Sequence, residues 1–216
     1  MPHVYVLRHH DSALQKSLRV LAAMPGWSLA GLGSHARTAA ADIARTQPDI
    51  VACDLRLADG PALRLEATLQ QMPQRPLVLL LADSPDDIDM FEALVHIGDG
   101  YAVEGSRTNG LMGALRRLAS GRASMSPRLA QQLLARATLG RSRLADALAP
   151  EAAQDFAPAG GSLGLTRSEQ HLLSLVAHGM LFGEITQRWR VLEDEVERRV
   201  HALYHRLHAG PVALAA

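Results

Sequence analysis

The order of the apolar runs constrains the fold of this chain more than any other feature. Before residue 120, short apolar runs alternate five times with segments whose apolar residues recur at helical spacing. Five consecutive strand–helix units favour a doubly wound α/β fold, in which helices cover both faces of a five-stranded parallel sheet. The expected strands are residues 4–7, 28–32, 50–54, 77–81 and 100–103. The expected helices are residues 13–24, 37–46, 62–71, 86–97 and 109–119.

An acidic side chain follows the most apolar part of the third expected strand. Residues 50–53 are apolar, and Asp54 comes next, at the strand end where open α/β sheets place their chemistry. The residues that follow the other strands belong to the same edge of the sheet. They are His9 and His10 after the first strand, Ala82 after the fourth and Glu104 after the fifth.

The C-terminal part of the chain has a purely helical pattern. Residues 126–138 predict one helix, and residues 147–164 are rich in Ala, Pro and Gly, which is typical of a flexible linker. Thr166 followed by Glu169 predicts a capping box that opens a helix ending at Gly179. A short helix over residues 184–189 comes next, and a last helix begins at about Glu193. Three short helices with tight connections favour a helix-turn-helix unit.

The segment from residue 165 to residue 207 resembles the LuxR-type helix-turn-helix. The matching positions are Leu165, Thr166, Glu169, Leu172, Val176, Ala177, Gly179, Glu184, Ile185, Val196, Val200 and Leu207. Together with the α/β half, the whole chain resembles a NarL/FixJ-family response regulator, over residues 3–134 and 163–208. The resemblance implies a flavodoxin-like receiver domain at residues 1–122, a helical and Ala/Pro/Gly-rich linker at 123–162, and a small all-α helix-turn-helix domain at 163–216.

The chain departs from this family at the residues that handle phosphate. Family members hold Mg²⁺ with two adjacent acids and the acceptor aspartate, and they use a hydroxyl and a lysine to bind the phosphoryl group. Here His9 and His10 replace the acids, Ala82 replaces the hydroxyl and Glu104 replaces the lysine. Mg²⁺ prefers about six oxygen ligands, and Glu104 would repel a phosphoryl group. We therefore expect a degenerate pocket in which Asp54 is not phosphorylated to a useful extent.

Three interpretations of His9, His10 and Asp54 remain open from the sequence. Imidazole and carboxylate groups suit a transition metal, but neighbouring residues on an extended segment point to opposite sides. A fixed His–Asp pair would hold the domain in one conformation. In the plainest interpretation the histidines satisfy local hydrogen bonds and Asp54 is a relic. We expect no metal site and no cofactor.

The predicted recognition helix carries an unusual excess of acids at its start. Glu193, Asp194, Glu195 and Glu197 oppose contact with phosphates, whose neutralisation supplies much of the affinity for DNA. Residues 163–216 contain as many acids as arginines, so we expect weak, salt-sensitive or partner-assisted DNA binding. Val196 is a candidate for contact with a thymine methyl group. The candidate DNA contacts are Arg188, Arg190, Val196, Arg198, Arg199 and Arg206.

Composition narrows the functional classes. Lys+Arg and Asp+Glu both number 22, so no global field attracts nucleic acid or membrane, and no apolar run approaches the length of a membrane span. The single cysteine, Cys53, fits a reducing, cytoplasmic setting. No nucleophile elbow, zinc spacing or phosphate-binding glycine loop indicates an enzyme.

These observations predict an atypical response-regulator-type transcription factor that binds DNA as a homodimer and is not controlled by phosphorylation. Its receiver-like half would serve dimerisation or contact with a protein partner. One alternative is a protein-interaction regulator that has lost DNA binding and sequesters another regulator. A further alternative is a small-molecule sensor, which would require a cavity at the former phosphorylation pocket.

Overall fold

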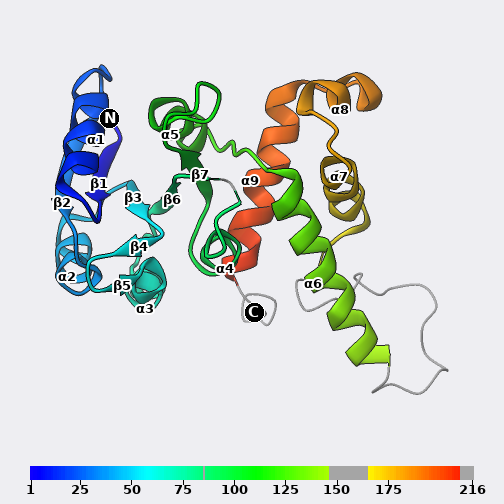
Figure 1. The fold of residues 1–216 in the computed structure, drawn as a ribbon, viewed down its shortest axis with the longest axis horizontal. Helices are drawn as coiled ribbons and strands as arrows, with labels where there is room; N and C mark the ends of the chain where they lie inside the picture. Colours follow the sequence, from blue (N-terminus) through cyan, green and yellow to red (C-terminus); the bar gives the residue numbers. More distant parts are fainter. Residues whose placement is uncertain (85, 146–164, 210–216) are drawn as a thin grey trace. The chain divides into compact units, whose positions relative to one another are not determined.

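The structure, a computed structural model, describes residues 1–84, 86–145 and 165–209 (Figure 1). The predicted linker at residues 147–164 lies outside the described residues. The chain divides into two compact units, one formed by Met1–Ser124 and the segment from Val200 onward, the other by Met125–Arg199. The boundary between the units falls within a helix, so the domain limits given by the sequence remain a proposal.

The first unit is built on a five-stranded parallel sheet with the order β2-β1-β3-β6-β7 (Figure 1). Each of the five predicted strands is present to within one residue at either end, which confirms the doubly wound α/β fold. The strands are β1 (His3–Leu7), β2 (Ser28–Gly33), β3 (Ile50–Asp54), β6 (Leu77–Ala82) and β7 (Gly100–Val103). The sequence pattern gave no sign of a short antiparallel pair, β4 (Arg56–Leu57) and β5 (Gly60–Pro61).

Helices α1 and α5 contact each other and cover one face of the sheet. Val4, Val6, Ile50 and Ala52 lie on this face, in one cluster with Leu115 of α5. Helices α2 and α4 contact the short 3-10 helix η1, and Tyr5, on the opposite face of β1, hydrogen-bonds to Asp42 of α2. The elements are α1 (Asp11–Ala22), α2 (Ala36–Thr46), η1 (Ala62–Leu65), α3 (Glu66–Gln71), α4 (Met90–His96) and α5 (Leu111–Ala119).

Two predicted helices become α-helical four residues later than the sequence indicated. The helix predicted over residues 86–97 begins only at Met90, because Ser84 and Asp87 accept hydrogen bonds from backbone N–H groups two residues further on and form turns. The helix predicted over residues 62–71 begins as η1 and becomes α-helical at Glu66. Neither change moves a strand end, so the carboxyl edge of the sheet stays as predicted.

The second unit is helical. It contains α6 (Pro127–Ala145), α7 (Arg167–Ala177), α8 (Phe182–Trp189) and the first turns of α9 (Glu193–Ala209), and α6 packs against α7. The predicted capping box is confirmed: the Thr166 N–H donates to Glu169 Oε2 at 2.7 Å, and the Glu169 N–H donates to Thr166 Oγ1 at 3.3 Å.

The core of this helical unit is formed by the apolar faces of its helices. Leu172 and Val176 of α7, Ile185 of α8 and Val196 of α9 are buried. Among the described helices, none combines the length and the apolar character needed to cross a bilayer.

Candidate functional site

The carboxyl edge of the sheet gathers the charged residues that follow its strands. Asp54 ends β3, Ala82 ends β6, and Glu104 comes directly after β7. The Glu104 N–H donates to the Ala82 carbonyl oxygen at 2.8 Å, which joins the last two strand ends. Because β1 ends at Leu7, the next residue, Arg8, leaves the sheet at this same edge.

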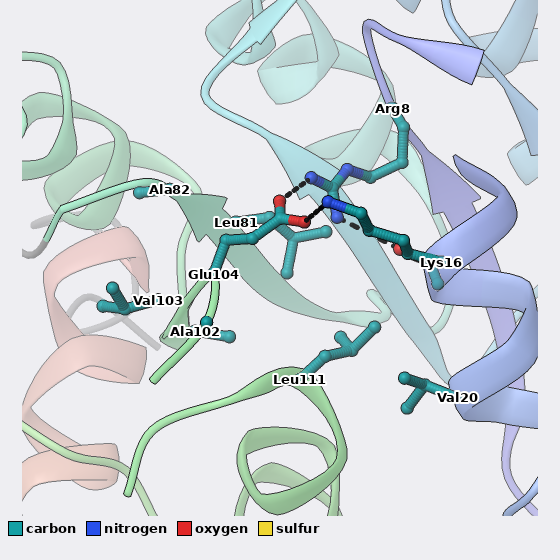
Figure 2. A pocket seen from close by; sticks show the side chains of 11 residues that line it. Arg8, Lys16, Val20, Leu81, Ala82, Ala102, Val103, Glu104 and Leu111 are labelled. Atoms are coloured by element: carbon teal, nitrogen blue, oxygen red, sulfur yellow. Dashed lines mark hydrogen bonds and ion pairs between the residues drawn. The ribbon is translucent and has the colours of Figure 1, made fainter. Parts of the chain in front are cut away.

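Arg8 is the centre of this edge. Only 8% of the residue is exposed, and its guanidinium contacts two carboxylates. Its Nε lies 2.8 Å from Asp54 Oδ1 in an ion pair. Its Nη2 donates to Glu104 Oε2 at 2.6 Å, as Figure 2 shows. Its Nη1 donates to Ser17 Oγ of α1 at 3.0 Å. A single buried cation therefore joins β1, β3, α1 and the residue after β7.

The side chains of the two histidines do not make the contact with Asp54 that the structure describes. Both are exposed, and their rings meet edge to face with centroids 4.3 Å apart. The group that reaches Asp54 is the backbone N–H of His9, which donates to Asp54 Oδ2 at 2.7 Å. Both oxygens of Asp54 are thus engaged, one by Arg8 and the other by a backbone N–H.

Burial and ion pairing act in opposite directions on the two carboxylates. Burial raises the pKa of Asp54 above its usual value, although the charge of Arg8 and the His9 N–H both oppose this. Burial also raises the pKa of Glu104, but hydrogen bonds from Arg8 and Lys16 outweigh it and hold the pKa below its usual value. Glu104 is therefore ionised at neutral pH and pairs with both cations.

The resemblance to response regulators implies a Mg²⁺ ion beside Asp54, and the residues at this edge do not fit one. A divalent cation would lie against the Arg8 guanidinium, which cannot lose its charge. The oxygen ligands that Mg²⁺ prefers are also absent from positions 9 and 10, which hold exposed histidines. Among the described residues, the cluster of three potential metal ligands that the structure contains lies elsewhere and includes none of His9, His10 and Asp54.

The sequence pattern did not identify Arg8 as a site residue. The signal was present, because Arg8 is the first residue after the first strand, just as Glu104 is the first residue after the fifth. An arginine at one strand end, with acids at two others, is an expected ion-pair network wherever parallel strands end at one edge.

The second candidate site is the exposed start of helix α9. Glu195 binds both arginines predicted to contact DNA: its Oε2 accepts from Arg198 Nη2 at 3.0 Å, and its Oε1 accepts from Arg199 Nε at 3.1 Å. The guanidinium carbon of Arg199 lies 5.4 Å from the ring centroid of Trp189, which itself packs edge to face on His171. The hydrogen bond from Arg198, followed by that from Arg199, lowers the pKa of Glu195, although its slight burial acts the other way.

The other residues predicted to contact DNA differ in position, and one of them is buried. Val196 has no exposed surface and packs in the core, so it cannot contact a base edge, and we remove it from the interface. Arg188 lies in the last turn of α8, and Arg190 caps that helix with a left-handed backbone (φ 54°). Arg206 lies in the last turn of α9.

Comparisons with known proteins find a transcriptional regulator of similar sequence and response regulators of similar fold. No protein-family model matches the chain. The chain is 26% identical to the DNA-binding transcriptional activator DevR/DosR of Mycobacterium tuberculosis over 208 residues, which cover 96% of this chain and 88% of that protein.

Solved structures share the fold. RcsB of Salmonella enterica serovar Typhimurium, bound to a promoter in the presence of the phosphomimetic BeF3⁻, matches with a TM-score of 0.52 and 15% identity over 96% of each chain. The signal receiver domain of the putative response regulator NarL of Mycobacterium tuberculosis matches with a TM-score of 0.51 and 20% identity, over 56% of this chain and 98% of that domain.

Proposed function

We propose that the chain is a response regulator of the NarL/FixJ type, with a receiver domain and a LuxR-type helix-turn-helix, and that it regulates transcription without phosphorylation of Asp54. One observation carries the second part of this proposal: the buried guanidinium of Arg8 binds Asp54 and Glu104 together. In the resembled family the acceptor aspartate binds Mg²⁺, whereas here it binds the guanidinium of Arg8, a permanent part of the chain.

The buried cation beside Asp54 is already paired without a phosphoryl group. The single positive charge of Arg8 contacts the two carboxylates of Asp54 and Glu104, and the exposed Lys16 reaches Glu104 at 3.4 Å. Phosphorylation would add about −1.5 to −2 charge without adding a cation. It would also use one of the two carboxylate oxygens of Asp54, and each of them already has a contact: Oδ1 with Arg8 and Oδ2 with the His9 N–H. Phosphoryl transfer depends mainly on positioning and charge neutralisation, so both of its requirements are opposed here.

We propose further that the chain binds DNA as a homodimer through the N-terminal part of α9. The named relatives support this, since DevR/DosR is a DNA-binding transcriptional activator and one RcsB structure contains two dimers bound to DNA. Arg198 and Arg199 are half-exposed and stand where a recognition helix meets the major groove. Arg188, Arg190 and Arg206 are the proposed phosphate contacts.

The contact of Glu195 with both arginines supports the rival function, a regulator that acts by binding protein. When DNA binds, Glu195 must either release Arg198 and Arg199 or remain as a negative charge beside the DNA phosphates, and both oppose binding. The proposed affinity is therefore low and sensitive to salt, and the protein-interaction regulator remains the second candidate.

A gel-shift titration on the chain's own promoter region separates the two functions. We expect a shift at about 50 mM salt that weakens strongly at about 200 mM and is lost when Arg198→Ala and Arg199→Ala are combined. Glu193→Gln serves as the matched surface variant, because Glu193 is exposed in the same helix and its change keeps both arginines. If no shift forms at the lower salt concentration, direct DNA binding is excluded and the rival function stands.

A further inference from the structure

Beside the Arg8 network the receiver contains a cavity of about 210 Å³. We propose that this cavity binds a small organic carboxylate, whose apolar part fills the cavity and whose carboxylate pairs with Lys16. Such a ligand gives the receiver an input that does not involve phosphate. Its binding goes beyond the proposed function and does not depend on whether the chain binds DNA.

The walls of the cavity are mostly apolar. Val20 of α1 and Leu111 at the start of α5 form one side, and Leu81 and Ala102, near the ends of β6 and β7, form its inner wall (Figure 2). Ala82 also lines the cavity, at the position where the resembled family carries a hydroxyl-bearing side chain. An apolar wall with few polar groups is typical of small-molecule sites.

The polar groups that line the cavity differ in how far their hydrogen-bonding atoms are already engaged. Arg8 is held by Asp54, Glu104 and Ser17, and Glu104 accepts hydrogen bonds on both of its oxygens. The Lys16 ammonium has three N–H donors, and its contact with Glu104 Oε1 is long, at 3.4 Å. Figure 2 shows its side chain reaching toward Glu104, and because this side chain is 67% exposed, it can move toward a ligand. A carboxylate is therefore the group that this mouth recognises.

The volume limits the size of the ligand. A cavity of 150 Å³ accommodates benzene, whereas drug-sized ligands occupy about 300 Å³ or more. At about 210 Å³, the cavity fits one aromatic ring or a short branched chain together with its carboxylate. Phenylacetate is a suitable probe, and phenylacetamide and phenethylamine are matched probes without charge and with the opposite charge.

Lys16 is the only lysine in the chain, which allows a direct measurement on the full-length protein. Protein labelled with ¹³C and ¹⁵N in lysine alone gives a single Lys side-chain signal. We expect phenylacetate to shift this signal saturably, with a dissociation constant of about 1 mM or tighter. The amide should bind about tenfold more weakly, which corresponds to the loss of one charge-assisted hydrogen bond, and the amine should not bind.

Variants test whether the ligand occupies the cavity. Val20→Phe and Leu111→Phe each fill part of it and should abolish the saturable shift; two variants are used in case one fails to fold. For Lys16→Gln, binding is followed by changes in the backbone amide signals of α1 and should weaken about tenfold, whereas Lys16→Arg should retain it. Arg19→Ala removes an exposed cation of the same helix that does not line the cavity and should change nothing.

Several results would overturn the proposal. They are the absence of a saturable shift with phenylacetate, equal binding of the amide, preferential binding of the amine, or an unchanged shift in both cavity-filling variants. A Lys16 signal that depends on protein concentration in the absence of ligand would show that a second copy of the chain covers the cavity, and this too would overturn it. None of these results bears on DNA binding or on phosphorylation of Asp54, which are measured separately.

Discussion

Replacing Glu195 with glutamine should strengthen DNA binding, because Glu195 holds the two arginines expected to contact DNA. The distances from its two oxygens to Arg198 Nη2 and Arg199 Nε are 3.0 and 3.1 Å. Each arginine that gains a phosphate contact steepens the slope of log K against log salt by about 0.9, so releasing two steepens it by up to about 1.8. Between about 50 and 200 mM salt, that steeper slope adds roughly a tenfold loss of affinity.

The assay is a fluorescence-anisotropy titration of wild type, Glu195→Gln and Glu193→Gln on the same promoter fragment at several salt concentrations. Both variants raise the net charge by one, but only Glu195→Gln removes the partner of Arg198 and Arg199. We expect tighter binding and the steeper slope for Glu195→Gln, and a smaller gain with little change of slope for Glu193→Gln. Equal effects of the two variants would mean that only net charge matters, and would refute the role given to Glu195.

Two further predictions concern the receiver. Arg8→Met leaves two carboxylates without their buried counter-ion and should lower the free energy of unfolding, measured in urea, by about 3 kcal/mol. Adding Asp54→Asn and Glu104→Gln to this variant should recover most of the loss. An Arg8→Met variant with unchanged stability would contradict the network. Asp59 accepts the N–H groups of Ala36 and Arg37 at the start of α2, and the Arg37 hydrogen bond is the main reason that its pKa is lowered. Asp59→Ala should therefore lower the free energy of unfolding by about 1 kcal/mol at neutral pH. This difference from wild type should shrink as pH falls through the lowered pKa of Asp59, because protonated wild type loses the same contact. A difference that persists in acid would contradict this role of Asp59.

The strand ends could be predicted from the sequence because each buried parallel strand is a short, nearly continuous apolar run. Ile50–Cys53, for example, is at most 1% exposed, and the polar residue that follows it marks the edge of the sheet. Helix starts were less predictable where side chains compete for backbone N–H groups. Ser84 and Asp87 use their oxygens in turns, which delays α4 to Met90.

The contact between Arg8 and Asp54 was not predicted, because the resemblance directed attention to other positions. Comparison with family members directed attention to His9 and His10, which replace the acids, whereas the residue that contacts Asp54 through its side chain is their neighbour Arg8. The resemblance also directed attention to Val196 as a residue of the recognition helix, although its spacing of 4, 3 and 4 with Val200, Leu203 and Leu207 is that of an apolar stripe that faces a core. Val196 therefore looked like a base contact in sequence, although it belongs to the core.

The central claim is that Arg8 takes the place of the cation that an aspartyl phosphate requires, and intact mass spectrometry tests it most directly. Wild type and Asp54→Ala are incubated with acetyl phosphate and Mg²⁺, beside a receiver that retains both acids as a positive control. We predict a phosphoryl adduct on the control and an unchanged mass for both forms of this chain. A stoichiometric adduct on the wild type that disappears in Asp54→Ala would contradict the claim.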